Sequence, residues 1–192
     1  MGSVGMPVPG TRLRIVDPVT NEDLPVGEEG MALVGGPQVM KGYYKEPEKT
    51  DEAVIVLDGK RWYRTGDKAF VDQDGFLTIV DRYSRFAKLG GEMVSLGAVD
   101  LRVGDTKILD GCEFVSTSIP DDVKGECIVL LFVGDKDTHT VSMALRKSGM
   151  PPLMIPGKVY AVEAIPKLGS GKWDFTSIKK MAVELSKKSS LR

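Results

Sequence analysis

The sequence predicts an α+β protein in which a small β-rich, barrel-like subdomain, residues 1–80, precedes a compact α/β domain, residues 81–192. Two observations carry this prediction. The first half contains short runs of alternating apolar and polar residues, separated by Gly, Pro, Asn and Asp, which is typical of strands joined by turns. After Asp81-Arg82, apolar strand-like runs alternate with segments of helical periodicity.

The strands expected in the first half are "TRLRIVD", "MALVGG", "RWYRT", "KAFVD" and "FLTIVD". The stretch "GYYKEPEKTDEAV" predicts one brief helix with Pro47 in its first turn, where the missing N–H would have no helical partner. The sequence "QDG" favours a hairpin between the last two strands. Strands this short and closely spaced indicate a small barrel or sandwich.

The strands expected in the second half are "RFAKL", "EMVS", "CEFVSTSIP", "CIVLLFVG" and "KVYAVEAIP". A helix is predicted over residues 95–109, with Ser95 as its N-cap. A second helix, "THTVSMALRKSG", should end at Gly149. The third, "DFTSIKKMAVELSKK", places its apolar residues on one face and its lysines late, where they suit the helix dipole.

Composition narrows the class of protein. Hydrophobic residues make up 42% and charged residues 28%, which is ordinary for a globular chain. The net charge of −1 gives no general attraction to nucleic acid, so we expect no nucleic-acid partner. Two cysteines in apolar runs indicate reduced core thiols, and a single histidine argues against a zinc site. No apolar run of about 18 residues is present, so we expect no membrane span.

The stretch "PKLGSGKWDF", residues 166–175, combines two glycines with a lysine and raises the question of a phosphate site. It does not fit a nucleotide P-loop, because Trp173 follows Gly171-Lys172 where Ser or Thr is needed, and Pro166 replaces the first glycine. A helix-capping turn and a loop that carries Lys172 to a substrate both remain open.

Four stretches occur together in order: "GMALVGGPQVMKGYY", "WYRTGD", "GFLTIVDRYSRFAKLGGEMV" and "PKLGSGKWD". In their order and spacing these motifs resemble those of the acyl-adenylate-forming (AMP-binding) superfamily. The residues of the motifs are most similar to those in the acyl-acyl-carrier-protein synthetase part of 2-acylglycerophosphoethanolamine acyltransferases. The resemblance implies a C-terminal fragment, with the end of the large adenylation domain followed by the mobile lid domain. The ATP phosphate loop, the Mg²⁺ ligands and the acyl pocket would lie in a missing N-terminal part of the same enzyme, so the fragment alone should be inactive.

The resemblance assigns nucleotide binding to Asp67, Ile79 and Arg82. Asp67 would accept hydrogen bonds from both ribose hydroxyls of ATP, because a carboxylate can accept two donors at once. Arg82 would contact the ribose or phosphate region. Asp81 resembles the hinge about which the small domain rotates between two half-reactions. The plain alternatives are a turn at Asp67, a surface ion pair at Arg82 and a strand end at Asp81.

The resemblance also assigns Lys172 as the catalytic residue, whose ammonium would touch the acyl carboxylate and the ATP α-phosphate during adenylation. Gly169 and Gly171 would let its loop move. Lys88, Gly90 and Gly91 would form the loop that serves the thioester step, where glycines admit a narrow pantetheine arm. The alternatives are a solvated lysine before a helix and a plain hairpin turn.

Three positions depart from the family pattern. Met31 stands where Glu or Gln is common, Asp174 where many members have a basic residue, and Arg85 where an acidic residue is frequent. Arg85 would contribute to a basic surface, which suits an acidic carrier protein better than CoA.

The expected function is an ATP- and Mg²⁺-dependent acyl-activating ligase. It would form a fatty acyl-adenylate and transfer the acyl group to a phosphopantetheine thiol of acyl carrier protein, for lysophospholipid reacylation. It would act on the cytoplasmic side, with attachment of the full-length protein to the inner membrane left open. The alternatives are an acyl-CoA synthetase, a carrier-loading adenylation domain, and a non-catalytic interaction domain that kept the fold.

Overall fold

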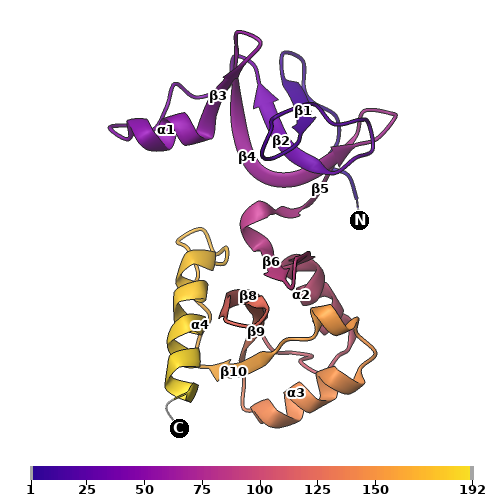
Figure 1. Ribbon diagram of the computed structural model, residues 1–192, viewed down its shortest axis with the longest axis vertical. Coiled ribbons are helices and arrows are strands. Elements are labelled where there is room, and N and C mark those ends of the chain that lie inside the picture. The colour runs from indigo at the N-terminus through magenta and orange to yellow at the C-terminus, as the bar shows by residue number, and fades with distance from the viewer. Residues whose placement is uncertain (1, 191–192) are drawn as a thin grey trace. The chain divides into compact units, whose positions relative to one another are not determined.

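The computed structural model describes residues 2–190 and divides into two compact units, Met1–Ser84 and Arg85–Arg192 (Figure 1). The division falls after Ser84, later than the boundary predicted at Asp81-Arg82. Both of those residues belong to a strand that is paired within the first unit, so the chain leaves the unit only afterwards.

The first unit is a curled five-stranded antiparallel sheet with one short helix (Figure 1). Its strand order is β1-β2-β4-β3, and β5 pairs with β4. The elements are β1 (Arg12–Val16), β2 (Gly30–Gly35), α1 (Pro47–Ala53), β3 (Val54–Leu57), β4 (Lys60–Val71) and β5 (Leu77–Arg82). Pro47 lies in the first turn of α1, as predicted.

Strand β4 corrects two predictions. The stretches "RWYRT" and "KAFVD" are not separate strands but one strand, because the ladder continues across "RTGD" through a bulge. Strand β3 was not predicted at all. It joins β4 through Asp58 and Gly59, both at positive φ, which is the geometry of a two-residue hairpin turn.

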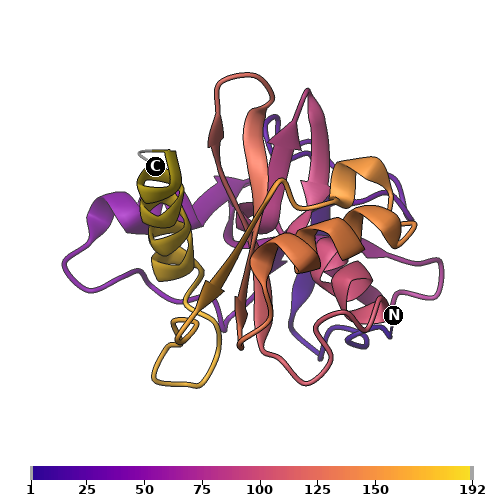
Figure 2. The same ribbon diagram turned by 90° about the horizontal axis from the view of Figure 1, so that it is seen from below.

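The second unit is a five-stranded sheet covered on both faces by helices (Figures 1 and 2). Its order is β10-β9-β6-β7, with β8 on β9; the β9–β10 pair is parallel and the others are antiparallel. The elements are β6 (Phe86–Leu89), β7 (Glu92–Ser95), α2 (Leu96–Asp105), β8 (Phe114–Asp121), β9 (Gly125–Val133), α3 (Thr138–Lys147), β10 (Lys158–Val162) and α4 (Phe175–Ser190), with single turns of 3₁₀ helix at Tyr83–Arg85 and Pro152–Met154.

Strand β9 is the centre of the second unit because it is buried on both faces. Ile128, Leu130 and Phe132 pack in the core that includes residues of α2 and α3. Val129 and Leu131 point the other way, into the core that includes α4. This explains the nearly continuous apolar run "CIVLLFV", which a strand with one solvated face would not have.

Helix α2 begins at its predicted cap, Ser95, and helix α4 is capped by Asp174. Ser95 accepts a hydrogen bond from the Ala98 N–H at 3.1 Å, and Asp174 accepts one from the Ser177 N–H at 3.1 Å. Helix α2 ends at Asp105 rather than at residue 109, because Lys107 takes a φ of 59°, which cannot continue a right-handed helix. With this correction the predicted fold class, a β-rich subdomain followed by an α/β domain, is confirmed.

Candidate functional site

The predicted site residues fall into two groups, and each group lies within one unit. The first unit carries the nucleotide and hinge residues, Asp67, Ile79, Asp81 and Arg82. The second unit carries the thioester-step loop and the catalytic lysine, Lys88, Gly90, Gly91 and Lys172.

A bulge in β4 presents Asp67. Residues 65–67 occupy the space opposite the single residue Ala32 of β2. Gly66 has a φ of 76°, in the left-handed region that favours glycine. The Thr65 hydroxyl closes the bulge: it donates to the Ala32 carbonyl and accepts from the Asp67 N–H, both at 3.0 Å. The sequence "RTGD" is therefore the local reason why Asp67 has a defined position.

Asp67 and Arg82 are register partners in the β4–β5 ladder, and their side chains form an ion pair. The distance from Arg82 Nε to Asp67 Oδ1 is 3.0 Å, with the arginine side chain 64% exposed and the aspartate 17%. An ion pair this exposed contributes about 0–1 kcal/mol, so a ligand can share or replace it at little cost. The pair places a carboxylate acceptor beside a fixed cation, which suits a vicinal diol next to an anionic group.

Tyr63 lies on the same strand, within "WYRTGD", and the sequence does not mark it as a site residue. Burial raises the pKa of Tyr63, with a hydrogen bond to Tyr43 as the next cause and the Asp67 charge adding to it, while Arg82 lowers it. A phenol therefore lies within electrostatic range of the ion pair. A strand tyrosine is more often a core residue, so the sequence offered no reason to single it out.

Ile79 and Asp81 lie on β5, where the register with β4 shifts between Lys68 and Ala69. Ile79 is 40% exposed, so its apolar surface is accessible to a ligand. Asp81 accepts a hydrogen bond from the Arg82 N–H at 2.8 Å. Their roles in nucleotide binding and as the hinge stay predictions.

The loop that contains Gly90 and Gly91 is a two-residue hairpin turn between β6 and β7. Leu89 and Glu92 are paired across it, and the φ values of the two glycines are 59° and 97°. Two consecutive positive φ angles explain both glycines by turn geometry alone. Lys88, just before the turn, is exposed. A role of this loop in a thioester step stays a prediction.

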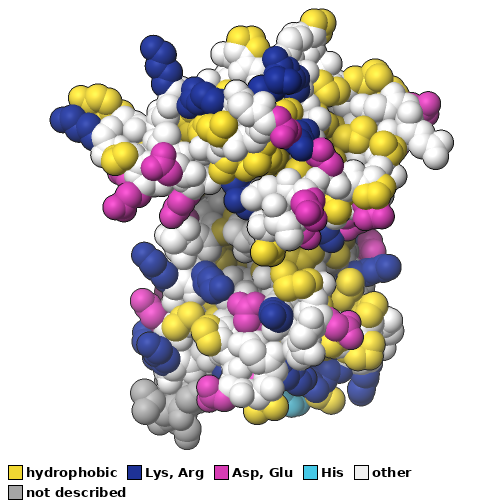
Figure 3. Space-filling view, turned by 45° about the horizontal axis from the view of Figure 1, so that its top comes forward, with side chains coloured by type: hydrophobic (Ala, Val, Ile, Leu, Met, Phe, Trp, Pro, Cys, Tyr) yellow, Lys and Arg dark blue, Asp and Glu magenta, His cyan; other side chains and the backbone are white. Residues whose placement is uncertain are grey.

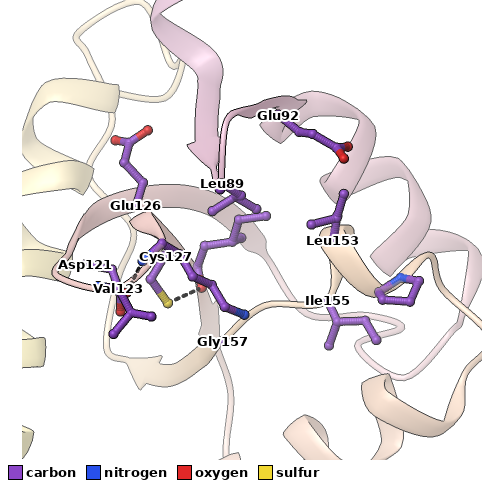
Figure 4. Close-up of a pocket in the computed structure, with 13 residues that line it drawn as sticks. Leu89, Glu92, Asp121, Val123, Glu126, Cys127, Leu153, Ile155 and Gly157 are labelled. Atoms are coloured by element: carbon purple, nitrogen blue, oxygen red, sulfur yellow. Dashed lines mark hydrogen bonds between the residues drawn. The ribbon is translucent and has the colours of Figure 1, made fainter.

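Beside this turn the second unit has an open cavity of about 560 Å³ (Figure 4). Leu89, Cys127, Leu153 and Ile155 give it a largely apolar wall, with Glu92 at its edge. Burial raises the pKa of the Cys127 thiol. Both cysteines are free, but they are half-buried rather than the fully buried core thiols that the sequence predicted.

Lys172 lies on a small hairpin rather than on an open loop. Lys167 and Trp173 form an isolated bridge at its base. The Leu168 N–H donates to the Lys172 carbonyl and the Gly171 N–H donates to the Leu168 carbonyl, both at 2.8 Å. These backbone donors are used within the hairpin, so they form no phosphate cradle. The exposed Lys172 side chain is left as the group that can reach a ligand.

Arg85 overturns the predicted basic surface for a carrier protein. Its side chain is 15% exposed and pairs with Asp100 on α2 at 2.5 Å. Its guanidinium also lies over the Phe175 ring, 4.5 Å from the centroid. The Arg85 charge is neutralised by Asp100 inside the second unit and is not available at the surface. The interpretation of Arg85 as a carrier-binding residue is therefore wrong.

Neither a metal-binding cluster nor a membrane-spanning helix is found among the described residues. They contain no group of three or more His, Cys, Asp or Glu side chains that could hold a metal ion. None of the helices described is long and apolar enough to cross a membrane. Basic and acidic side chains are interspersed on the face shown in Figure 3.

Comparison with known proteins shows that this chain is similar to AMP-binding enzymes. The family model for AMP-binding enzymes matches residues 1–44. A long-chain-fatty-acid–CoA ligase of Salmonella typhimurium is 37% identical over 174 residues, which cover 89% of this chain and 30% of the relative. A feruloyl-CoA synthase of Amycolatopsis is 32% identical, over 90% of this chain and 34% of the relative. The chain thus spans about a third of the length of these relatives.

Solved structures of adenylate-forming enzymes have the same fold as this chain. ATP-bound MatB from Rhodopseudomonas palustris superposes with a TM-score of 0.78 and 28% identity, covering 94% of this chain and 35% of that one. The amide bond synthetase McbA from Marinactinospora thermotolerans has a TM-score of 0.71 and 27% identity, covering 93% of this chain and 36% of that one. The fold is that of the C-terminal part of the adenylate-forming enzymes, and the resemblance to the AMP-binding superfamily is confirmed. The finer similarity to acyl-acyl-carrier-protein synthetases stays a prediction.

Proposed function

We propose that this chain is the C-terminal part of an ATP-dependent acyl-activating enzyme, which forms an acyl-adenylate and then transfers the acyl group to a phosphopantetheine thiol. The observation that carries the proposal is the "RTGD" bulge, which holds Asp67 in register with Arg82 and leaves their ion pair accessible. This pairing of a carboxylate with a cation matches the ribose and phosphate side of a nucleotide.

The residues present fit one part of ATP and not all of it. Asp67 can accept hydrogen bonds from the two ribose hydroxyls, and Arg82 can bind an anionic oxygen beside them. The described residues contain no cluster of metal ligands for Mg²⁺. The proposal therefore assigns the magnesium and most phosphate contacts to the portion of the relatives that this chain does not match.

In the first half-reaction a carboxylate oxygen of the acyl substrate attacks the α-phosphorus of ATP, and pyrophosphate leaves. Both reactants are anionic, so a cation that contacts both lowers the barrier. Lys172 is suited to this role, because its hairpin leaves the ammonium exposed. In the second half-reaction a thiol attacks the acyl carbon and AMP leaves.

CoA is the favoured thiol in this proposal. Two relatives are named as a CoA ligase and a CoA synthase. A basic surface for an acidic carrier protein would need an exposed Arg85, and Arg85 is paired with Asp100 inside the second unit. Transfer to acyl carrier protein, lysophospholipid reacylation and the cytoplasmic location stay predictions.

The test uses the full-length enzyme that contains this chain and measures the two half-reactions separately. Lys172→Ala should lower fatty-acid-dependent ATP–pyrophosphate exchange by roughly 10²–10³-fold, the usual cost of losing one contact to developing charge. Thioester formation from preformed acyl-adenylate should be spared. Lys187→Ala, which removes an exposed lysine of α4, is the matched control and should change neither rate.

A second variant tests the nucleotide site. Asp67→Asn keeps the shape but removes the charge and one acceptor, so the KM for ATP in the exchange assay should rise by about tenfold. Asp74→Asn, at an exposed turn position, should leave it unchanged. A wild-type enzyme without exchange activity on any carboxylic acid would refute the proposed function. An equal loss of both half-reactions in Lys172→Ala would refute the role of that lysine.

A further inference from the structure

We propose that Glu126 is the positioning residue of the turn Leu89–Glu92, and that it sets the rate of the thioester half-reaction without touching the substrate. This inference rests on the proposed function, because the resemblance assigns that turn to the second half-reaction. The geometric part, that Glu126 holds the turn, stands on the contacts of the second unit alone.

The first contact lies where a strand ladder opens. Strands β6 and β9 meet at one register pair, Leu89 with Gly125. At the next position the Lys88 N–H would need a carbonyl of β9 to continue the ladder. The Glu126 carboxylate takes that place, and its Oε2 accepts from the Lys88 N–H at 2.7 Å. A side chain, rather than the backbone, therefore fastens the last part of β6 to the central strand.

The Glu126 carboxylate is itself fixed from the opposite side. Its Oε1 accepts from the hydroxyl of Ser118, a residue of β8 that is 3% exposed, at 2.8 Å. Lys179 of α4 approaches the same oxygen at 3.5 Å. The Glu126 side chain is 24% exposed. Elements on both sides of β9 thus hold the carboxylate that holds the turn.

The charge of this carboxylate is maintained by its partners. Burial by itself would raise the pKa of Glu126, but the hydrogen bonds from the Lys88 N–H and Ser118, together with the Lys179 charge, outweigh it and lower the pKa. Glu126 is therefore ionised at neutral pH, and a hydrogen bond from a backbone N–H to an ionised acceptor is among the stronger ones.

The glycine tip of the turn has few other supports. The Gly90 N–H donates to the Lys124 carbonyl at 2.8 Å, which is the second anchor. Apart from chain neighbours, no described heavy atom lies within 4 Å of the position that a Cβ of Gly90 or Gly91 would occupy. Leu89, at the start of the turn, is 7% exposed and packs in the core, so it anchors the base of the turn. The tip, Gly90-Gly91, has no side chains to pack, and the hydrogen bonds to Lys124 and Glu126 are the contacts that hold it from outside the hairpin.

The experiment compares Glu126→Ala and Glu126→Gln in the full-length enzyme. In Glu126→Ala, thioester formation from preformed acyl-adenylate should fall by about 10–100-fold, while ATP–pyrophosphate exchange stays within about twofold. Glu126→Gln should restore most of the loss, because the amide oxygen can accept from the Lys88 N–H and the amide nitrogen can donate to Ser118. Glu163→Ala, at an exposed residue just after β10, is the matched control.

Hydrogen exchange read by mass spectrometry provides a measurement that needs no activity. Peptides that cover residues 86–92 should exchange faster in Glu126→Ala and at the wild-type rate in Glu126→Gln. Wild-type protection of these peptides in Glu126→Ala would overturn the proposal, as would an equal fall of both half-reactions. A thioester rate in Glu126→Gln as low as in Glu126→Ala would assign the effect to charge and would also overturn it.

A second variant and a separate reading of the hydrogen-exchange data cover the cases in which Glu126→Ala does not fold or the enzyme is inactive. If Glu126→Ala does not fold, Ser118→Ala, which removes one donor to the carboxylate, should give faster exchange of residues 86–92, and unchanged exchange would refute the proposal. If the wild-type enzyme forms no acyl-adenylate, the proposed function fails. The exchange data then decide separately whether Glu126 holds the turn.

Discussion

Replacing Arg85 by methionine would leave the Asp100 carboxylate of the second unit without its cation, and we expect the free energy of unfolding to fall by about 3 kcal/mol. The two side chains are 15% and 22% exposed and their charged atoms lie 2.5 Å apart, so this is a largely buried pair. Removing one partner of such a pair costs about 3–5 kcal/mol. The lower end applies because Asp100 keeps the hydrogen bond from the Ser116 N–H at 2.7 Å.

The loss should depend on pH in a defined direction. Burial raises the pKa of Asp100 above its ordinary 3.8, and Arg85 opposes that rise. Without Arg85 the pKa should climb further, so the folded state binds the proton more tightly than the unfolded state does. The stability deficit of Arg85→Met is therefore small below the ordinary pKa and grows as the pH rises through the raised pKa.

Urea unfolding followed by circular dichroism at pH 4 and pH 7 measures both effects, with each variant compared to wild type at the same pH. Arg102→Met, at an exposed position of α2, is the control and should change stability by less than about 0.5 kcal/mol. The double variant Arg85→Met/Asp100→Asn should recover part of the loss, since no buried charge remains. A deficit no larger than that of Arg102→Met, or one independent of pH, would refute the reasoning.

Three further predictions concern local structure. Ser95→Ala removes the cap of α2 and should cost about 1 kcal/mol in urea unfolding, with Ser95→Asp retaining most of the stability. Gly90→Ala places a Cβ at a φ of 59° and should cost about 1–2 kcal/mol, whereas Gly90→Asn should cost less; equal losses would argue against strain in the turn. The pKa of Asp137 is lowered by hydrogen bonds from the Thr140 N–H and hydroxyl. The stability lost in Asp137→Ala should therefore be present above pH 3.8 and vanish as the pH falls through the lowered pKa, and a gap that persists in acid would contradict this.

Local sequence rules predicted much of the fold. The apolar face of α4, the cap at Ser95 and the double burial of β9 all follow from patterns within a few residues. Strand β3 was predictable by the same rules, because the Asp58-Gly59 pair between "VIVL" and "KRWY" is a strong hairpin signal.

Other features depend on contacts between distant segments. The single long strand β4 exists because β2 continues to pair with it across the bulge. The burial of Arg85 depends on Asp100, and the role of Glu126 depends on Lys88, which is 38 positions away in the sequence. The family resemblance predicts that Asp67 and Arg82 bind the same nucleotide. Their direct ion pair could not be predicted, because it depends on the register between β4 and β5. No periodicity in the sequence encodes such pairings.

Gly157 and Cys127, which both line the cavity beside the Leu89–Glu92 turn, pack so closely that the side-chain volume tolerated at one depends on the other (Figure 4). A Cβ on Gly157 would lie 2.6 Å from the Cys127 sulfur, while a hydrogen bond from the Gly157 N–H to the Ile128 carbonyl, at 2.9 Å, opposes a shift of the backbone. Substitutions at the two sites should therefore be non-additive: Gly157→Ala alone should lower stability, and the same change should cost less once residue 127 is reduced to alanine. Among homologues, this volume trade-off predicts that the side chain at one position shrinks where the other grows.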